Sequence, residues 1–351
     1  LSATRVDASQ LIEKGRENYV TYSQDFSQWP LAGAATRTLG VTDPNGGTTA
    51  ATISNIPSGN NSDGIILQSQ PMVLAAGNVV CQSIYLKGSG TIAFSMERSL
   101  GGSYFFNSSI VTLTSEWQRF NYFAVINSPA AGFSYYVTNR NGTTATSVDV
   151  AFAQFEFGTA PTAYIPTNSS SVTAGILENT PRFDYSGGAT CPSLLLEPSR
   201  DNRIVQSEYF GGWTANTTIT ANAALSPEGV QNAYNIASNS GVGNGILLIS
   251  GVLSSTQYVC SIYVKSAGAT TGKLRLFDGS SGASTTTTFT PTSEWQRVEV
   301  TRTTGAGTFQ VRTDIHSNDG DLLIYGAQLE AGSYSTSYIP TYGVNQTRAV
   351  D

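Results

Sequence analysis

The stretch YGAQLEAGSYSTSYIPT, residues 325–341, has a close relative earlier in the same chain, AFAQFEFGTAPTAYIPT at residues 151–167. Each copy carries Gln-x-Glu, a Gly two residues after the Glu, a Tyr eight residues after it, and the same Tyr-Ile-Pro-Thr ending. A phrase of this length that recurs in one chain indicates a duplicated structural unit.

Further motifs recur in the same order and extend the duplication over most of the chain. They are CQSIYLK (81–87) and VCSIYVK (259–265), TSEWQRF (114–120) and TSEWQRV (292–298), DPNG (43–46) and SPEG (226–229), and two segments that end at Trp29 and Trp213. Residues 3–18 and 181–202 also align, through Arg-x-Asp, an apolar pair before Glu, and a final Arg-acid-Asn. The sequence therefore predicts a tandem duplication.

The ordered motifs divide the chain into five segments. We expect an N-terminal joint at 1–18, unit one at 19–170, an inter-domain joint at 171–202, unit two at 203–342, and the start of a further joint or tail at 343–351. Each unit, at roughly 150 residues, is long enough to bury its own core. The start at Leu1 and the joint-like TRAVD ending lead us to expect a segment of a longer or processed polypeptide.

Composition narrows the classes of protein. Charged residues make up 12% of the chain, against an ordinary ~25%. The net charge of −6 offers no basic footprint and argues against nucleic-acid binding. No apolar run reaches the ~18 residues of a membrane helix, so no membrane insertion is expected.

Short runs of alternating apolar and polar residues predict half-buried strands throughout. The residues expected on one face are Ile92, Phe94 and Met96 in one run, Leu274 and Leu276 in another, and Phe309, Val311 and Ile315 in a third. Gln10 to Glu17 is the one helix-like stretch, and Gly15 interrupts it. We predict an all-β chain of two tandem β-sandwich (jelly-roll) domains, joined by a short hairpin-like linker in which FDY and SLLLE pair.

Three cysteines, Cys81, Cys191 and Cys260, form neither a C-x-x-C pair nor an even set. This pattern argues against a disulfide framework and a zinc site. We expect buried free thiols and folding in a reducing cell interior.

The residues offer no catalytic set, and we expect no enzyme and no cofactor. His316 is the single histidine, has no counterpart in unit one, and is interpreted as a strand residue. The repeated acids are Glu13/Glu197, Glu116/Glu294 and Glu156/Glu330. A glycosidase would need two of them facing each other across a cleft, whereas salt bridges or backbone caps explain them without one.

Aromatic residues at loop-like positions are the candidates for ligand binding. A sugar platform would use Trp29 with Tyr22 and Gln28 in unit one, and Trp213 with Tyr209 and Asn216 in unit two. The alternative is that these tryptophans belong to the core, as we expect for Trp117 and Trp295.

Taken together, the motifs resemble a known group of proteins. SIYLK, EWQRF, AQLEAGSYSTSYIPT and TRAVD are similar to the jelly-roll modules of bacteriophage virion proteins, the carbohydrate-binding-like domains of tail fibres, tail proteins and head appendages. The resemblance implies a non-enzymatic, sugar-binding-like sandwich displayed on a virion that is made in the bacterial host cytoplasm. It also implies a structural calcium with Asp149 and Glu156 as ligands, a pattern from which unit two departs at Gly320 and Asp321.

Two classes of function follow from that resemblance. In the first, the domains project from the particle in many copies, as a homo-oligomer or beside other virion proteins, and bind bacterial surface polysaccharide. In the second, they decorate a capsid or tail and bind no glycan. Exposed aromatic platforms in both units would favour the first, and buried tryptophans would favour the second.

Overall fold

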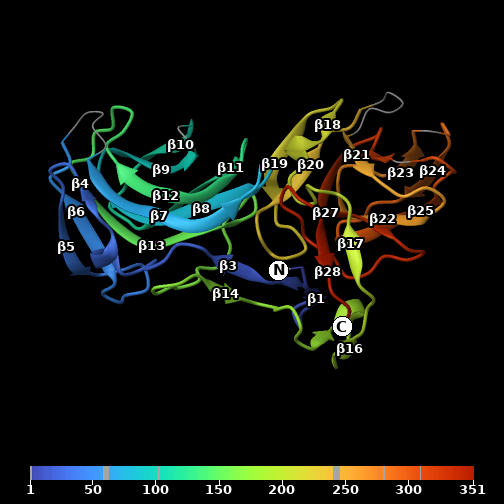
Figure 1. Ribbon diagram of the computed structural model, residues 1–351, viewed down its shortest axis with the longest axis horizontal. Coiled ribbons are helices and arrows are strands. Elements are labelled where there is room, and N and C mark those ends of the chain that lie inside the picture. The colour runs from blue at the N-terminus through green and yellow to red at the C-terminus, as the bar shows by residue number, and fades with distance from the viewer. Residues whose placement is uncertain (1, 58–62, 101–102, 240–245, 280, 309) are drawn as a thin grey trace. The chain divides into compact units, whose positions relative to one another are not determined.

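The computed structural model describes residues 2–57, 63–100, 103–239, 246–279, 281–308 and 310–351 (Figure 1). These residues form β-strands and three short 3-10 turns, η1 (Phe26–Gln28), η2 (Ser186–Gly188) and η3 (Phe210–Gly212), with no α-helix among them. None of the described helical segments has the length and apolar character to span a bilayer. The all-β prediction is confirmed.

The chain divides into two compact units, and one of them is discontinuous. One unit is Glu17–Ala174, and the other joins Leu1–Arg16 to Gly175–Asp351. The N-terminal segment therefore belongs to the unit that contains the second sandwich, which the sequence motifs did not indicate.

The first sandwich consists of two five-stranded antiparallel sheets (Figure 1). One sheet has the order β10 (Ser103–Thr112), β9 (Thr91–Leu100), β12 (Ala130–Thr138), β7 (Gly64–Leu74) and β4 (Leu31–Ala32). The other has the order β11 (Gln118–Val125), β8 (Val79–Gly88), β13 (Ser147–Phe157), β6 (Ala50–Ser54) and β5 (Thr36–Val41).

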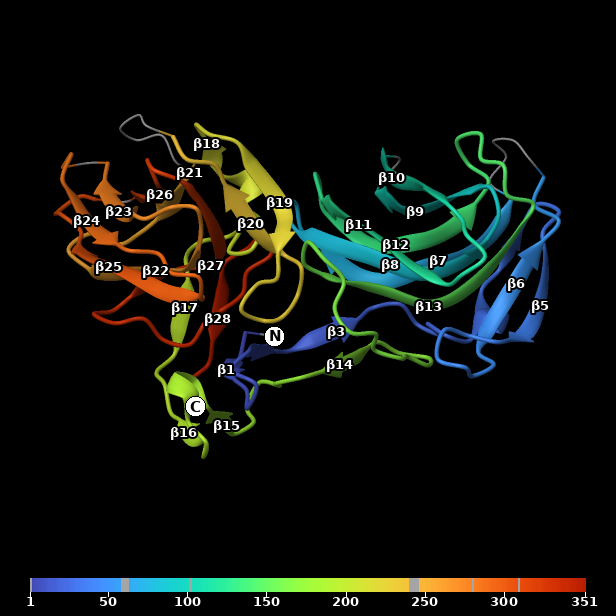
Figure 2. The same cartoon turned by 180° about the vertical axis from the view of Figure 1, so that it is seen from behind.

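The second sandwich repeats this plan (Figure 2). One sheet has the order β18 (Thr214–Ala215), β21 (Ile246–Gly251), β26 (Gln310–His316), β23 (Gly272–Asp278) and β24 (Ser284–Phe289). The other has the order β19 (Ile219–Ala224), β20 (Ala233–Ile236), β27 (Asp321–Ala331), β22 (Gln257–Ala267) and β25 (Gln296–Thr303). The expected fold of two tandem sandwiches is confirmed.

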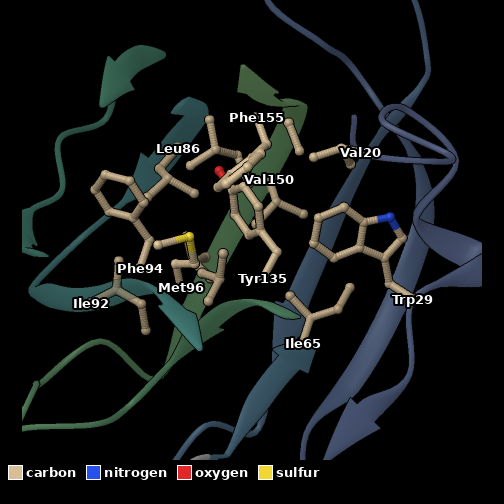
Figure 3. Close-up of a cluster of buried hydrophobic side chains, with 14 of the residues drawn as sticks. Val20, Trp29, Ile65, Leu86, Ile92, Phe94, Met96, Tyr135, Val150 and Phe155 are labelled. Atoms are coloured by element: carbon tan, nitrogen blue, oxygen red, sulfur yellow. The ribbon is translucent and has the colours of Figure 1, made fainter. Parts of the chain in front are cut away.

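Alternating side chains from both sheets fill the space between them. In the first sandwich Ile92, Phe94 and Met96 are at most 1% exposed, as their period of two predicts (Figure 3). Trp29 and Tyr135 pack edge to face in the same core, with ring centroids 5.5 Å apart. In the second sandwich Leu274, Leu276, Val311 and Ile315 are equally buried, whereas Phe309 lies outside the described residues.

The repeated Gln-x-Glu is a polar latch that holds the chain after the last strand. Glu330 Oε1 accepts hydrogen bonds from Gln328 Nε2 at 2.8 Å and the Thr336 amide at 2.7 Å, while its Oε2 accepts from Thr336 Oγ1. Glu156 makes the same three contacts with Gln154 and Thr162. Because both oxygens of each acid are used, these repeated carboxylates are structural.

Two other repeated residues complete the latch. Arg297 donates to the Thr336 carbonyl and to Ser261 Oγ, which explains the Arg of Glu-Trp-Gln-Arg. Asn202 Nδ2 donates to the Ala327 and Ile339 carbonyls. Their counterparts Arg119 and Asn18 make the equivalent bonds in the first sandwich. The Tyr-Ile-Pro-Thr ending is buried in the second sandwich, whereas in the first Tyr164 is half-buried and Pro166 is exposed.

Both joints form small hairpins. β1 (Thr4–Val6) pairs with β2 (Ile12–Lys14), and β15 (Arg182–Asp184) pairs with β16 (Ser193–Leu195), which confirms the predicted hairpin-like linker. Two further pairs fix the ends of the sandwiches. They are β3 (Arg16–Asn18) with β14 (Val172–Ala174), and β17 (Arg200–Asn202) with β28 (Gln346–Arg348). Gln10 to Glu17, the one stretch with a helix-like pattern, contributes β2 and part of β3.

The first hairpin docks on the second sandwich through a buried ionic cluster. Lys14 contacts Glu208, Glu228 at 2.9 Å and the Tyr325 hydroxyl at 3.0 Å, and both its own side chain and the two carboxylates are 1% exposed. Arg16 reaches Glu228 as well. Burial would raise the pKa of Glu228, but the charges of Arg16 and Lys14 outweigh this effect and lower it to about 2.

Candidate functional site

The two tryptophans proposed as sugar platforms are buried. Trp29 is 1% exposed and Trp213 is 4% exposed. Their indole N–H groups donate to the Tyr22 and Gln206 carbonyls at 3.0 and 3.1 Å. The platform prediction is wrong because the turns η1 and η3 direct each indole into the core, against Phe26 and Phe210.

The companions of these tryptophans form no shared surface with them. Gln28 and Asn216 are exposed, whereas Tyr22 and Tyr209 are half-buried beside the cores. Tyr22 has a left-handed φ of 53° and uses its carbonyl for Trp29. These four residues therefore lack the exposed indole on which the prediction depended.

The proposed calcium ligands do not come together. Asp149 and Glu156 lie seven residues apart on one strand, which corresponds to about 20 Å. Asp149 accepts a hydrogen bond from Thr52 Oγ1 at 2.6 Å, and Glu156 is closed inside the latch. Within the described ranges no group of three His, Cys, Asp or Glu residues could hold a metal ion, and the pairing of Asp149 with Glu156 is corrected accordingly.

The cysteines divide between core and surface. Cys81 and Cys260 are buried and free, as predicted, and burial raises the pKa of Cys260 to about 12. The protonated, enclosed thiol is unreactive. Cys191 is free but exposed, near the second hairpin, which differs from the expectation of three buried thiols.

A polar surface emerges instead on the outer side of β23 and β26, opposite the core. Lys273, Arg275 and Phe277 alternate with the buried residues of β23. On β26 the residues of the same parity are Arg312, Asp314 and His316. The register pairs Lys273 with His316, Arg275 with Asp314, and Phe277 with Arg312. We call these six residues the β23–β26 face; Figure 2 labels the two strands that carry it.

Asp314 is the centre of this face. It is 1% exposed, its Oδ2 accepts from Arg275 Nε at 3.2 Å and also from Arg275 Nη2, and its Oδ1 lies 3.2 Å from His316 Nδ1. Burial would raise the pKa of Asp314, but the hydrogen bonds from His316 and Arg275 and the Arg275 charge lower it below its usual value. The carboxylate is thus ionised and fixes both neighbours.

Arg312 packs over an aromatic ring beside this trio. Its guanidinium carbon is 4.6 Å from the centre of the Phe277 ring, a cation–π contact. Its Nε is buried and has no hydrogen-bond partner in the described part of the chain. The exposed hydroxyls of β24 border this face, since Ser284, Thr286 and Thr288 stand opposite Phe277, Arg275 and Lys273.

The first sandwich has different chemistry at the same positions. On the corresponding strands β9 and β12 the outward positions include Ala93 and Ser95, and Tyr136 stands opposite Ser95. Arg140 lies 4.5 Å from the centre of the Tyr136 ring. The Ser95 hydroxyl is buried and lacks a hydrogen-bond partner. The two sandwiches share their cores and latches but not this outer surface.

Sequence reasoning passed over the β23–β26 face although the signal was present. The same alternation that placed Leu274, Leu276 and Val311 in the core places the residues between them on the outer side. His316 does lie on a strand, as expected, but its Nδ1 is paired with the Asp314 carboxylate two residues away. The charged residues at the polar positions of KLRLF and QVRTDIH were the available signal.

No protein-family model matches the chain, and no curated protein matches it. Among solved structures, the N-terminal tandem of two CBM22 modules from Paenibacillus barcinonensis Xyn10C is similar over 95% of this chain and 100% of its own, with 13% identity and a TM-score of 0.37. The C-terminal family 22 carbohydrate binding module of Clostridium thermocellum Xyn10B shows 18% identity over 42% of this chain and 97% of its own, with a TM-score of 0.30.

A third similar structure comes from a virus. The enzymatically active domain of bacteriophage CBA120 tailspike protein 4 is similar over 37% of this chain and 21% of its own, with 13% identity and a TM-score of 0.29. At these identities the likenesses concern the fold alone.

Proposed function

We propose that this chain is a non-catalytic carbohydrate-binding protein whose β23–β26 face contacts glycans. The observation that carries the proposal is the fixed set of Arg275, Asp314 and His316 beside Arg312 stacked on Phe277. Planar hydrogen-bonding groups held in place beside an aromatic edge can orient sugar hydroxyls. A flat sheet face buries little area, so single-site affinity is modest, roughly millimolar to micromolar.

The same geometry supports binding rather than hydrolysis. A glycosidase needs two carboxyl groups on either side of the scissile bond. Asp314 is the one carboxylate that β23, β24 and β26 direct to the outer face within their described residues. Both of its oxygens are occupied by Arg275 and His316, and its lowered pKa does not suit a general acid.

We further propose that the chain is displayed in many copies on a bacteriophage particle, where it contacts host surface polysaccharide and other virion proteins. The motif resemblance supports this placement. Copies linked on one particle would raise avidity by roughly 10²–10⁴ over the single-site affinity without new contacts.

A glycan array probed with a multivalent display of residues 2–351 tests the proposal. We expect weak binding by the wild type that the paired substitutions Phe277→Ala and Arg312→Ala abolish. Lys265→Ala, on the other sheet of the same sandwich, is the matched control and should bind as the wild type does. No binding by the wild type would overturn the proposal.

One observation favours a second candidate function. Trp29 and Trp213 are both buried, as a purely structural decoration domain without glycan binding would have them. That candidate predicts an empty array together with stoichiometric incorporation of the chain into particles.

A further inference from the structure

The balance of charge on the β23–β26 face specifies the ligand more narrowly. We propose that this face selects acidic polysaccharide, in which sugar carboxylates alternate with hydroxyls, an inference that rests on the proposed carbohydrate-binding function. The face combines three cations, Lys273, Arg275 and Arg312, with one anion, Asp314. The chain as a whole carries a net charge of −6, so a locally cationic surface runs against its composition.

The cations retain donors that the protein does not use. Asp314 accepts hydrogen bonds from Nε and Nη2 of Arg275. No described residue accepts a hydrogen bond from Nη1 of the same side chain. Lys273 Nζ has no hydrogen-bond or ion-pair partner among the residues that the structure describes. Arg312 donates no hydrogen bond to any described residue, and its Nε is shielded from water. Unused charged donors at defined positions are suited to carboxylate acceptors.

Two of the three cations are held before a ligand arrives. Arg275 is fixed by the buried Asp314, and Arg312 is fixed by the Phe277 ring. A guanidinium that is already oriented loses less conformational freedom on pairing with a carboxylate than a mobile one does. Lys273, by contrast, remains a flexible point charge at the end of the row.

The spacing of the cations suits a chain rather than a single sugar. Lys273, Arg275 and the Phe277–Arg312 pair occupy three successive outward positions along β23. At ~3.3 Å per residue they span about 13 Å along the strand. The hydroxyls of Ser284, Thr286 and Thr288 run beside this row on β24 and add neutral contacts between the charges.

The first sandwich supplies an internal contrast. On β9, the counterpart of β23 in the sheet order, the outward residues Ala93 and Ser95 carry no charge, unlike Lys273 and Arg275. The corresponding face of the first sandwich should therefore not favour acidic polymers. The acidic preference belongs to the second sandwich alone.

Affinity electrophoresis of the full chain can test the inference with three polymers in the gel. They are polygalacturonate, its carboxyl-reduced neutral form, and dextran sulfate. We expect polygalacturonate to retard the protein at least tenfold more strongly than the reduced polymer does, and the retardation to weaken as salt rises. Lys273→Gln with Arg312→Gln, which keep side-chain size, should lose at least tenfold in affinity, while Lys265→Gln should not.

Each alternative result of the electrophoresis would contradict a different part of the inference. Equal binding to the neutral polymer would overturn the acidic preference and leave the glycan-binding proposal standing. Equal or tighter binding to dextran sulfate would overturn carboxylate selection. Unchanged binding by the folded double variant, with the wild-type melting temperature, would overturn the assignment to this face. Failure of the wild type on these polymers and on the glycan array would overturn the proposed function itself.

Discussion

Phe152 and Gly326 occupy the same position in the repeated last strand, at a bulge with left-handed backbone, φ 52° and 61°. In the first sandwich the Phe152 ring stacks on Tyr164, with ring centroids 4.7 Å apart. In the second sandwich Gly326 carries no ring, and Tyr338, the counterpart of Tyr164, lies in a buried cluster with Tyr325 and with Ile12 of the N-terminal hairpin. One sandwich stacks its own Phe152 on this tyrosine, whereas the other brings the hairpin into the cluster.

Gly326→Phe should release the N-terminal hairpin. A Cβ at position 326 would lie 3.2 Å from Tyr263 and 3.3 Å from Tyr338, so a full ring would displace Tyr338 from the cluster that it shares with Ile12. The loss of a buried Ile contact is worth about 2–5 kcal/mol. Hydrogen exchange of residues 2–16 should become fast, while the first sandwich keeps its protection. Unchanged protection of the hairpin would contradict this account.

At Phe152 we expect the glycine variant to be more stable than the alanine variant, the reverse of the usual order in strands. Removal of the ring costs about 3–5 kcal/mol in a well-packed site. Phe152→Gly, however, relieves the left-handed backbone that Phe152→Ala retains, by about 1 kcal/mol. Denaturant unfolding should therefore find the glycine variant more stable than the alanine variant. The opposite order, which is usual in strands, would show that the bulge is not strained.

The hairpin contact should weaken in acid. The pKa of Glu228 falls from its ordinary 4.5 to about 2 in the folded protein, so its contribution is present in full above pH 4.5 and is lost as pH falls toward 2. The protection factors of residues 2–16 against hydrogen exchange should fall as pH drops through that window and stay constant from pH 5 to 7. Glu228→Gln removes this titration and should flatten the profile. A profile that stays steep in this variant would assign the acid response to other carboxylates.

Lys14→Met should destabilise the second unit more than the same substitution at a less buried lysine would. The substitution leaves Glu208 with its buried charge unpaired, although Arg16 still reaches Glu228. Breaking a buried pair in this way costs about 3–5 kcal/mol. Thermal unfolding should show a lower transition for the second unit, and Lys265→Met serves as the control. Equal stability of the two variants would mean that methionine packing replaces the ion pairs.

The sequence predicted the fold because its signals were local or repeated. Alternation placed Ile92, Phe94 and Met96 correctly, and the duplicated phrase revealed the two units. Trp29 was misplaced because its burial depends on η1, a three-residue turn with no strong sequence signal. The Arg275–Asp314 pair depends on strand register across a long separation, which local patterns do not fix. Docking of Lys14 with Glu208 is equally remote in sequence.

The discontinuous unit has a mechanical consequence. Residues 2–16 are bound to the second sandwich, and Asp351 is bound to Arg182 of the second hairpin, so both ends of the described chain are anchored in one unit. The first sandwich is connected as a side branch between Arg16 and Gly175. Tension applied between residues 2 and 351 passes through the hairpins and the second sandwich. The first sandwich is shielded from that force until the buried ionic cluster around Lys14 breaks.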